Sequence, residues 1–217
     1  MNGIVIIGAG GHGRGILEIL RAAASDRSDA PAVHGFLDDH ADLAGTTVGG
    51  VSVLGGLGLV PELAGRHHFL IGVGDPDPRR EIALRLSEME AEFATAVHPS
   101  AVIYGDVTLG PGTVIGAGVV IAANTTLGPH CLVNLGATVG HDCRLAAYAT
   151  VGPGANLGGF VTMDEGSFVG LGGVVVPGKS IGSGSKLGPG SVLLEDLGPD
   201  RIAFGVPARV VDRRRRR

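Results

Sequence analysis

A glycine-rich segment near the amino end has the residue types and spacing of a phosphate-binding loop. It has the pattern G-x-G-x-x-G and lies between an apolar run, Gly3–Ile7, and a helical pattern at residues 14–24. Glycines let a ligand approach the backbone closely, and the free N–H groups at a helix start attract a diphosphate. The residues that we expect to contact such a nucleotide-linked ligand are Gly8, Gly10, Gly11, His12 and Gly13.

Two acids, Asp38 and Asp39, follow the next apolar segment, residues 34–37. A carboxylate at this place typically binds a ribose hydroxyl, so both are expected to bind substrate. The alternatives are a dinucleotide such as NAD and a tight turn without a ligand. The segment is too short for a full dinucleotide-binding fold, and no hydride-transfer site follows it, which favours a nucleotide-linked ligand.

The carboxyl-terminal half contains two histidines that could do chemistry, His130 and His141, and Asp142 follows the second. Histidine has the ordinary pKa closest to neutrality, which suits it to proton transfer. Without further information, each histidine would be expected to lie at a turn with its side chain exposed to solvent. Their spacing of eleven residues cannot supply the three histidines of a β-helical zinc site such as that of a carbonic anhydrase, so no metal is expected.

The cysteines, Cys131 and Cys143, occupy the small-residue position of a six-residue repeat. Because they are two repeats apart, we expect packed, reduced thiols and no disulfide.

The histidines lie within a segment in which aliphatic residues recur every six positions, and the structure of this repeat must position them. Every sixth residue from Ile103 to Leu193 is a medium-sized aliphatic, and Gly or Ala mostly follows it. Such a period indicates a solenoid, and six fits neither the α-helical repeat nor the heptad. The pattern predicts a parallel β-helix in which each hexad supplies a strand and a turn, with one aliphatic side chain pointing inward.

The first hundred residues instead alternate strands and helices. Strands are expected at Gly3–Ile7, 34–37, 68–73 and 93–97, with helices at 14–24 and from Asp77, the expected N-cap. This order predicts a small, Rossmann-like parallel sheet with right-handed crossovers. The expected domains are an α/β domain at 1–97 that binds a nucleotide-linked ligand, a β-helix with a carboxyl-terminal cap at 98–212 and an arginine tail at 213–217.

Charge and hydropathy exclude several classes of protein. The net charge is −4, and removing the five terminal arginines leaves a body of −9 (−4 minus 5), which argues against nucleic acid as a partner. The amino end lacks a signal-peptide pattern, and no apolar stretch approaches a membrane span, so a cytoplasmic protein is expected. The arginine tail is expected to be a solvated end.

Six segments together resemble one family along nearly the whole chain: VIIGAGGHGR, GFLDD, IGVGDPDPRR, AVHPSAVI, VNLGATVGHDC and GVPAR. They are similar to the hexapeptide-repeat sugar acetyltransferases of the bacillosamine and perosamine type and to the related sialic acid O-acetyltransferases. The resemblance implies a left-handed β-helix with three hexads per coil and a homotrimer. It also implies acetyl-CoA bound between subunits and a nucleotide-activated amino sugar bound by the amino-terminal domain.

The same resemblance assigns roles within the repeat. It makes His141 the general base that takes the proton of the attacking sugar amine, with Asp142 orienting the ring. Neighbouring strand residues point to opposite faces, so their contact requires the corner to turn one of them. Gly159, one coil after His141, would donate a backbone N–H to the tetrahedral intermediate.

Three further residues follow from the resemblance with less definite roles. Asn134 matches a polar site of the family motif or is simply a corner residue. Thr150 stands where the family usually has a second histidine near the thioester. Arg209, in the GVPAR segment, would lie near CoA, and Lys179 and Lys186 are either phosphate contacts or ordinary surface charge.

The sequence therefore predicts an acetyl-CoA-dependent N-acetyltransferase of a nucleotide-linked amino-deoxysugar, with direct transfer and no acyl-enzyme. The alternatives are O-acetylation of a sugar such as sialic acid and a non-catalytic, sugar-binding β-helix.

Overall fold

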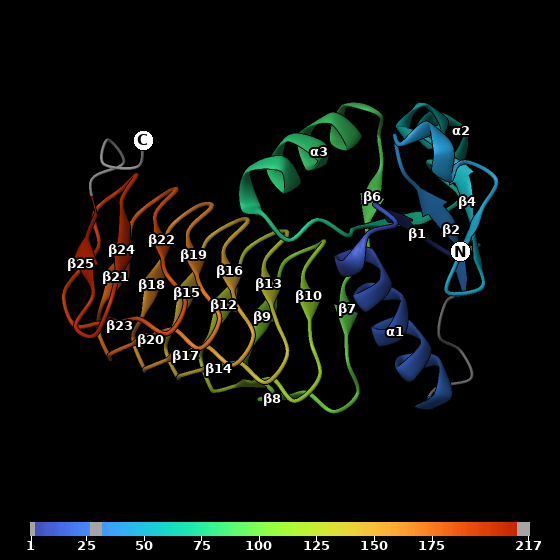
Figure 1. Ribbon diagram of the computed structural model, residues 1–217. Helices are drawn as coiled ribbons and strands as arrows, with labels where there is room; N and C mark the ends of the chain where they lie inside the picture. The colour runs from blue at the N-terminus through green and yellow to red at the C-terminus, as the bar shows by residue number, and fades with distance from the viewer. Residues whose placement is uncertain (1–2, 27–31, 212–217) are drawn as a thin grey trace. The chain divides into compact units, whose positions relative to one another are not determined.

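The computed structural model describes residues 3–26 and 32–211, in two compact units, Met1–Pro99 and Ser100–Arg217 (Figure 1). The predicted arginine tail lies outside the described residues. No helix in the described part of the chain is long and apolar enough to cross a membrane.

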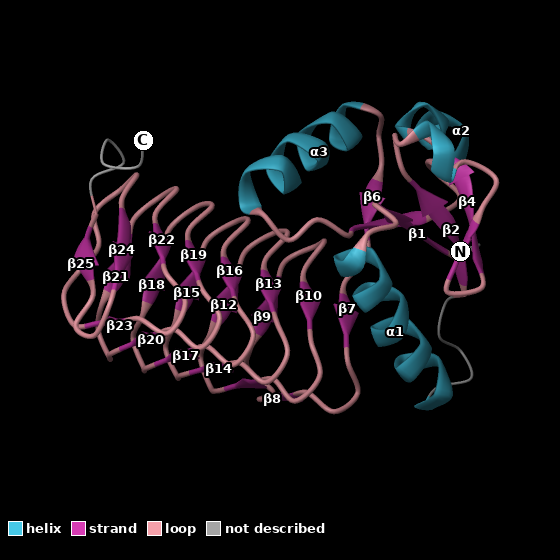
Figure 2. Ribbon diagram, viewed as in Figure 1, coloured by secondary structure: helices cyan, strands magenta, loops and turns pink. Residues whose placement is uncertain are grey.

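The first unit is an α/β domain around a mainly parallel sheet (Figure 2). The strands run in the order β3-β4-β2-β1-β5-β6, and the β3–β4 pair is antiparallel. The elements are β1 (Ile4–Ile7), α1 (Gly11–Asp26), β2 (Val33–Leu37), 3-10 helix η1 (Ala41–Leu43), β3 (Thr47–Val48), β4 (Val51–Gly55), 3-10 helix η2 (Leu57–Leu59), α2 (Val60–Leu63), β5 (His68–Ile71), α3 (Pro76–Glu88), β6 (Glu92–Phe93) and β7 (Ala96–Val97).

The central strand β1 is buried along its whole length, as its unbroken apolar run predicts. Part of the core consists of Val5, Ile7, Leu37 and Phe69 from the sheet, with Leu86 of α3 packed against them. The predicted α/β class with a parallel sheet is therefore confirmed.

The structure differs from the sequence prediction in the start of α3, in the strand predicted at 93–97 and in an additional hairpin. Helix α3 begins two residues earlier than expected, because Asp75 is the N-cap instead of Asp77 and accepts a hydrogen bond from Asp77 N–H at 3.3 Å. The strand predicted at 93–97 is two short strands, β6 and β7. The β3–β4 hairpin was not predicted, although Gly49 and Gly50 both have positive φ and form the kind of Gly-Gly turn that marks hairpins.

The second unit is a parallel β-helix of stacked two-residue strands. Each strand pairs with the strand three elements later, for example Val114 with Leu132 and Leu132 with Thr150, so one coil is 18 residues. The strands are β8 (Val102–Ile103), β9 (Thr108–Leu109), β10 (Val114–Ile115), β11 (Val120–Ile121), β12 (Thr126–Leu127), β13 (Leu132–Val133), β14 (Thr138–Val139), β15 (Arg144–Leu145), β16 (Thr150–Val151), β17 (Asn156–Leu157), β18 (Thr162–Met163), β19 (Phe168–Val169), β20 (Val174–Val175), β21 (Ser180–Ile181), β22 (Lys186–Leu187) and β23 (Val192–Leu193).

Three parallel sheets form the walls of this prism. We call the sheet of β10, β13, β16, β19 and β22 the first wall, the sheet of β8, β11, β14, β17, β20 and β23 the second wall, and the sheet of β9, β12, β15, β18 and β21 the third wall. The sixth-position aliphatics point inward, and from Ile115 to Leu193 every one of them is buried. This arrangement is the left-handed β-helix that the hexad period and the resemblance predict.

A short hairpin follows the last coil. Its strands are β24 (Ile202–Phe204), which pairs with β22, and β25 (Arg209–Val210), which is antiparallel to β24. The ring of Phe204 packs over Gly188, where a Cβ atom would lie 1.9 Å from it. The hairpin thus covers a backbone edge that the last coil would otherwise expose.

Candidate active site

His141 and Asp142 lie at the corner between the second and third walls, after β14 and before β15. Asp142 has a left-handed backbone with φ of 58°, which turns its side chain toward its neighbour. His141 Nδ1 lies 2.7 Å from Asp142 Oδ2. The corner therefore supplies the turn that contact between adjacent residues requires.

The ring of His141 stands at the surface. Its side chain is 57% exposed, and the ring of Phe160 meets it edge-on with centroids 5.0 Å apart. Because Nδ1 faces the Asp142 carboxylate, Nε2 is the nitrogen that can exchange a proton with a ligand.

Gly159 lies one coil after His141 at the same corner. A Cβ atom at Gly159 would be 2.7 Å from His141 Nε2, so the imidazole occupies space that only glycine leaves open. Among the described residues, no hydrogen bond from the Gly159 N–H is found, whereas its carbonyl accepts one from Gly178. The Gly159 N–H is thus available to a ligand.

Asp142 has a second partner, Asn124, one coil earlier. The Asn124 amide Nδ2 donates a short hydrogen bond to Asp142 Oδ1. The hydrogen bonds from His141 and Asn124 hold the pKa of the Asp142 carboxyl below its usual range. The carboxylate is therefore ionised wherever the histidine can act as a base.

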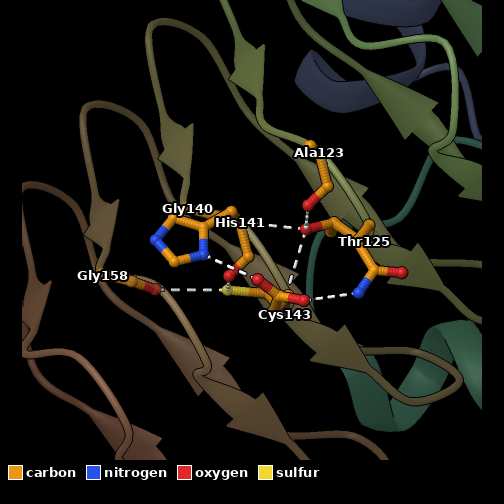
Figure 3. Close-up of polar contacts among 8 residues, drawn as sticks. Ala123, Thr125, Gly140, His141, Cys143 and Gly158 are labelled. Carbon is orange, nitrogen blue, oxygen red and sulfur yellow. Dashed lines mark hydrogen bonds and ion pairs between the residues drawn. The ribbon is translucent and has the colours of Figure 1, made fainter.

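Buried groups beneath the surface fix this corner (Figure 3). Thr125 Oγ1 donates to the Gly140 carbonyl at 2.9 Å and accepts from the Cys143 N–H at 3.2 Å. The Cys143 thiol donates to the Gly158 carbonyl at 3.2 Å. These contacts connect three successive coils.

Neither cysteine is placed as a nucleophile. Cys131 and Cys143 are both free and buried, as predicted. Burial raises the pKa of the Cys143 thiol, so little thiolate forms there. A thioester could not reach either sulfur atom without opening the coil.

The residue type at the left-handed position differs from one corner of the prism to another. Between the first and second walls it is glycine in successive coils, at Gly118, Gly136, Gly154, Gly172 and Gly190. Between the second and third walls it is Asn124, Asp142 and Phe160 in three successive coils, with φ of 56° to 61°. Non-glycine residues adopt this conformation at a cost of about 1 kcal/mol each. The corner between the third and first walls also has non-glycine residues at this position, His130 and Tyr148.

A groove of about 680 Å³ runs along the third wall beside Asp142. It offers a guanidinium from Arg144, a carboxylate from Asp164 and the ring of Phe160. Its lining residues are Asn124, Thr126, Gly128, Asp142, Arg144, Leu145, Ala146, Phe160, Thr162, Met163 and Asp164.

Three predicted residues lie away from His141 within one chain. Asn134 is at the corner between the first and second walls, where its Oδ1 accepts from the Leu135 N–H at 2.8 Å. Thr150 is buried on the first wall, which is opposite the corner of His141. Arg209 is exposed on β25, in the terminal hairpin. The fold does not bring these three together with the histidine.

The prediction that His130 is exposed is wrong. Only 5% of its surface is accessible, and its ring stacks on that of Tyr148 with centroids 5.3 Å apart. Both residues fill left-handed corner positions in successive coils, and a side chain at Gly112, one coil earlier, would collide with the histidine ring. His130 therefore packs as part of the corner.

A cavity of about 390 Å³ lies at the carboxyl ends of the strands in the first unit, where parallel α/β sheets bind ligands. Gly8, Asp38 and Asp39, which the sequence predicts to bind substrate, line it. The other lining residues are Ile7, Leu37, His40, Leu57, Val73, Glu81, Ile82 and Arg85.

The two acids of this cavity also hold its loops. Asp38 Oδ2 accepts from the Ala9 N–H at 2.9 Å, and its Oδ1 lies 2.7 Å from His40 Nδ1. Asp39 Oδ1 accepts from the Leu57 N–H at 2.8 Å. Each carboxylate therefore has loop contacts that leave only part of its accepting capacity for a ligand.

The remaining glycines of the loop divide into two groups. Gly10 and Gly11 have no heavy atom near their missing Cβ positions, so the backbone there is open to a ligand. A Cβ atom at Gly13 would lie 1.8 Å from the Gly8 carbonyl oxygen. None of these three glycines lines the cavity, and the missing side chain of Gly13 serves the packing of α1 against β1.

His12 is part of the first turn of α1 and does not line the cavity either. Burial, and then the charge of Arg79, lower the pKa of this imidazole to about 4. Arg79 is itself held by the carbonyls of Val73 and Gly74. His12 is therefore neutral near pH 7.

Sequence reasoning missed Asn124 and the α3 residues of the cavity, Glu81, Ile82 and Arg85. The spacing of 18 residues between Asn124 and Asp142 could have identified the first. Nothing in the sequence alone shows that α3 reaches the cavity. No group of three or more potential metal ligands is found among the described residues.

Two family models match the chain. The PglD N-terminal domain matches residues 3–86, and the bacterial transferase hexapeptide model, of six repeats, matches residues 94–123. The first model therefore matches the α/β domain, and the second matches the beginning of the β-helix.

Solved structures are similar over nearly the full length. Perosamine N-acetyltransferase from Caulobacter crescentus, in complex with CoA and GDP-perosamine, is 36% identical over 98% of both chains with a TM-score of 0.90. The acetyltransferase domain of PglB from Neisseria gonorrhoeae FA1090, in complex with acetyl coenzyme A, is 28% identical over 97% of this chain and 99% of that one, with a TM-score of 0.88.

A curated relative is UDP-N-acetylbacillosamine N-acetyltransferase from Bacillus subtilis (strain 168), 36% identical over 112 residues. The match covers 52% of this chain and spans half the length of that relative.

The β-helix, with a histidine–aspartate pair on its corner, defines an acyltransferase of the hexapeptide-repeat class. The chain belongs to the sugar acetyltransferases that join a PglD N-terminal domain to hexapeptide repeats.

Proposed function

We propose that this protein transfers the acetyl group of acetyl-CoA to the amino group of a nucleotide-linked amino sugar. The observation that carries the proposal is the orientation of His141, whose Nδ1 faces Asp142 while Nε2 faces Gly159. The complex of the Caulobacter crescentus relative with CoA and GDP-perosamine supports the choice of both substrates.

His141 acts as the general base in a direct transfer. The amine nitrogen attacks the thioester carbonyl carbon, and Nε2 takes the proton that the nitrogen loses. The tetrahedral intermediate then collapses, the C–S bond breaks, and the CoA sulfur leaves with a proton. Asp142 stabilises the imidazolium that forms in between. Two solved structures of the Caulobacter crescentus relative carry a replaced histidine, Asn in one and Ala in the other, which agrees with such a role.

Gly159 stabilises the intermediate. Its N–H donates to the developing oxyanion, and the missing side chain lets the thioester approach Nε2. Donors of this kind typically contribute about 10²–10³ in kcat.

The amino-terminal cavity binds the nucleotide. Gly10 and Gly11 present open backbone to the diphosphate, while Asp38 and Asp39 face the ribose. The apolar residues Leu37, Leu57 and Ile82 form a surface against which a nucleobase can pack. His12 and Gly13 act indirectly by shaping the start of α1.

The active unit is a homotrimer. The outward residues of the second wall include Val102 and Val120, and the neighbouring corner presents Leu135 and Leu171, of which more than half the surface is exposed. His141 lies at the other edge of this wall, so a protomer packed on it would flank the histidine. A neighbour is also the route by which Asn134 or Arg209 could reach acetyl-CoA beside His141, whereas Thr150 is buried within its own chain. The use of acetyl-CoA by the protein supports a cytoplasmic reaction.

The test is release of CoA, followed with a thiol reagent, for a panel of UDP-, GDP- and dTDP-linked amino sugars. We expect turnover that depends on the amino group, and a loss of about 10²–10⁴ in kcat in His141→Asn with the fold unchanged. Turnover only with sugars that lack an amine would favour O-acetylation. A near-normal kcat in His141→Asn would refute the base assignment, and failure of every sugar would favour a binding scaffold.

A further inference from the structure

We propose that Asn124 is a positioning residue of the acetyl transfer, acting on His141 through Asp142. The inference rests on the proposed function and adds a third member to its histidine–aspartate pair. The residues lie on two successive coils, with Asn124 before β12 and the pair before β15.

The first ground is the division of the Asp142 carboxylate between two partners. Its Oδ2 faces His141 Nδ1 at 2.7 Å, and its Oδ1 accepts from the Asn124 amide. With one oxygen committed to Asn124, the carboxylate plane is fixed and cannot rotate toward solvent. An ionised carboxylate held in this way keeps the proton of the neutral ring on Nδ1. The lone pair that accepts the amine proton is then on Nε2.

The second ground is that the backbone locks the two coils together at this point. The Asp142 N–H donates to the Ala123 carbonyl at 2.9 Å. On the other side, Thr125 Oγ1 accepts from the Cys143 N–H at 3.2 Å. Asn124 is thus flanked by two contacts to the coil of Asp142, and its amide needs little reorganisation to reach the carboxylate.

The third ground is the backbone conformation of Asn124 itself. Its φ is 56°, where glycine would be relaxed and is in fact used in successive coils of the corner between the first and second walls. Asparagine tolerates this conformation better than most residues, and its amide can donate to a carboxylate, which an aspartate could not do. The position therefore carries a side chain that is compatible with the turn and has a partner on the catalytic corner.

The structure offers a clean deletion of this amide. In Asn124→Gly the left-handed turn is kept and only the side chain is lost, and Asp142→Gly, with φ of 58°, is its counterpart. Asp200→Gly is the matched control, because Asp200 also has a left-handed backbone, with φ of 54°, at a corner beyond β23.

We expect Asn124→Gly to lower kcat about tenfold and to leave the KM for both substrates within about twofold, since the amide acts on the base and not on substrate binding. In an Asp142→Gly background the same substitution should cause no further loss of kcat. Asp200→Gly should retain wild-type kcat. An additional tenfold loss in the Asp142→Gly background would overturn the inference.

A second measurement does not depend on turnover. Nitrogen-15 NMR of the imidazoles, with the signal of His141 assigned from His141→Asn, reports which ring nitrogen carries the proton. We expect the proton on Nδ1 in the wild-type protein and a shift of population toward Nε2 in Asn124→Gly. An unchanged tautomer with unchanged kcat would refute the role of Asn124. Wild-type activity in His141→Asn would instead refute the proposed base.

Discussion

The imidazole of His141 occupies the space that a side chain at Gly159 would need, at the same corner of the next coil. A Cβ atom on Gly159 would lie 2.7 Å from Nε2, well inside van der Waals contact. The nitrogen that is turned away from Asp142 is therefore the one that meets the next coil. Stacking of the coils thus sets both the position of the base and the atom through which it reacts.

This relationship predicts the effect of Gly159→Ala. The added methyl group must displace the imidazole ring, because the glycine backbone is fixed in the coil. We expect kcat to fall at least about tenfold, with little loss of stability since the ring is exposed.

Gly198→Ala is the control, because nothing lies within 4 Å of the Cβ position there. Steady-state rates and melting temperatures of the two variants test the prediction. A Gly159→Ala variant as active as Gly198→Ala would contradict it.

Gly11→Ala tests the nucleotide subsite. No atom lies near the missing Cβ at Gly11, so the free protein should tolerate the methyl group, whereas a diphosphate at the start of α1 should not. We expect the affinity for GDP or UDP, measured by calorimetry, to fall at least about tenfold. Equal affinity in Gly11→Ala and in Gly15→Ala, which also points into open space, would remove the loop from the binding site.

Gly13→Ala tests a packing role at the same helix. A methyl group 1.8 Å from the Gly8 carbonyl oxygen cannot be accommodated without moving α1 from β1. We expect a loss of about 3 kcal/mol or more in the free energy of unfolding. Gly15→Ala, in the same helix, should instead stabilise by about 0.5–1 kcal/mol. Denaturant titrations measure the unfolding free energy of both variants, and equal stability of Gly13→Ala and Gly15→Ala would contradict the packing role.

Acid should destabilise the first unit through His12. Its pKa is about 4 in the folded protein against an ordinary 6.5, so below pH 6.5 the unfolded chain binds a proton that the folded chain does not. Stability is fully present above pH 6.5 and is lost toward pH 4, by up to about 1.4 kcal/mol per pH unit.

Urea titrations across this range should give a shallower pH dependence in His12→Gln than in the wild-type protein. His40 provides the opposite sign, because its contact with Asp38 raises the pKa of this exposed imidazole. His40→Gln should therefore not weaken the fall in unfolding free energy that occurs as the pH is lowered from 6.5 toward 4. Identical pH profiles for the wild-type protein and His12→Gln would contradict the effect.

The sequence predicted the parts of the fold that follow from periodicity. The hexad from Ile103 to Leu193 requires a β-helix, because no other structure turns one side chain in six inward with an unbroken phase. Combined with the three hexads per coil that the family resemblance implied, this period placed Gly159 one coil after His141. The run Ile4–Ile7 was recognised as a buried strand for the same reason, since its apolar residues are continuous.

Contacts between side chains were beyond the sequence. His130 fills the left-handed position of its corner, where it stacks on Tyr148 and is buried, whereas His141 stands one position earlier in its hexad and is exposed. The one-position difference within the hexad did not show in the sequence which ring would pack and which would stay exposed. The 18-residue spacing could have placed Asn124 beside Asp142, but the hydrogen bond of its amide depends on a left-handed turn at both ends, which the sequence does not show.

Because the coils of the β-helix stack at a regular spacing, the number of coils sets the distances along its axis. His141 precedes β15, and the terminal hairpin joins β22, so the span from base to cap is set by the constant rise of about 4.8 Å per coil. Inserting or deleting 18 residues would alter that span by one layer while preserving every inward side chain. Acyl donors of different length could thus be matched by counting layers, without redesigning the corner that does the chemistry.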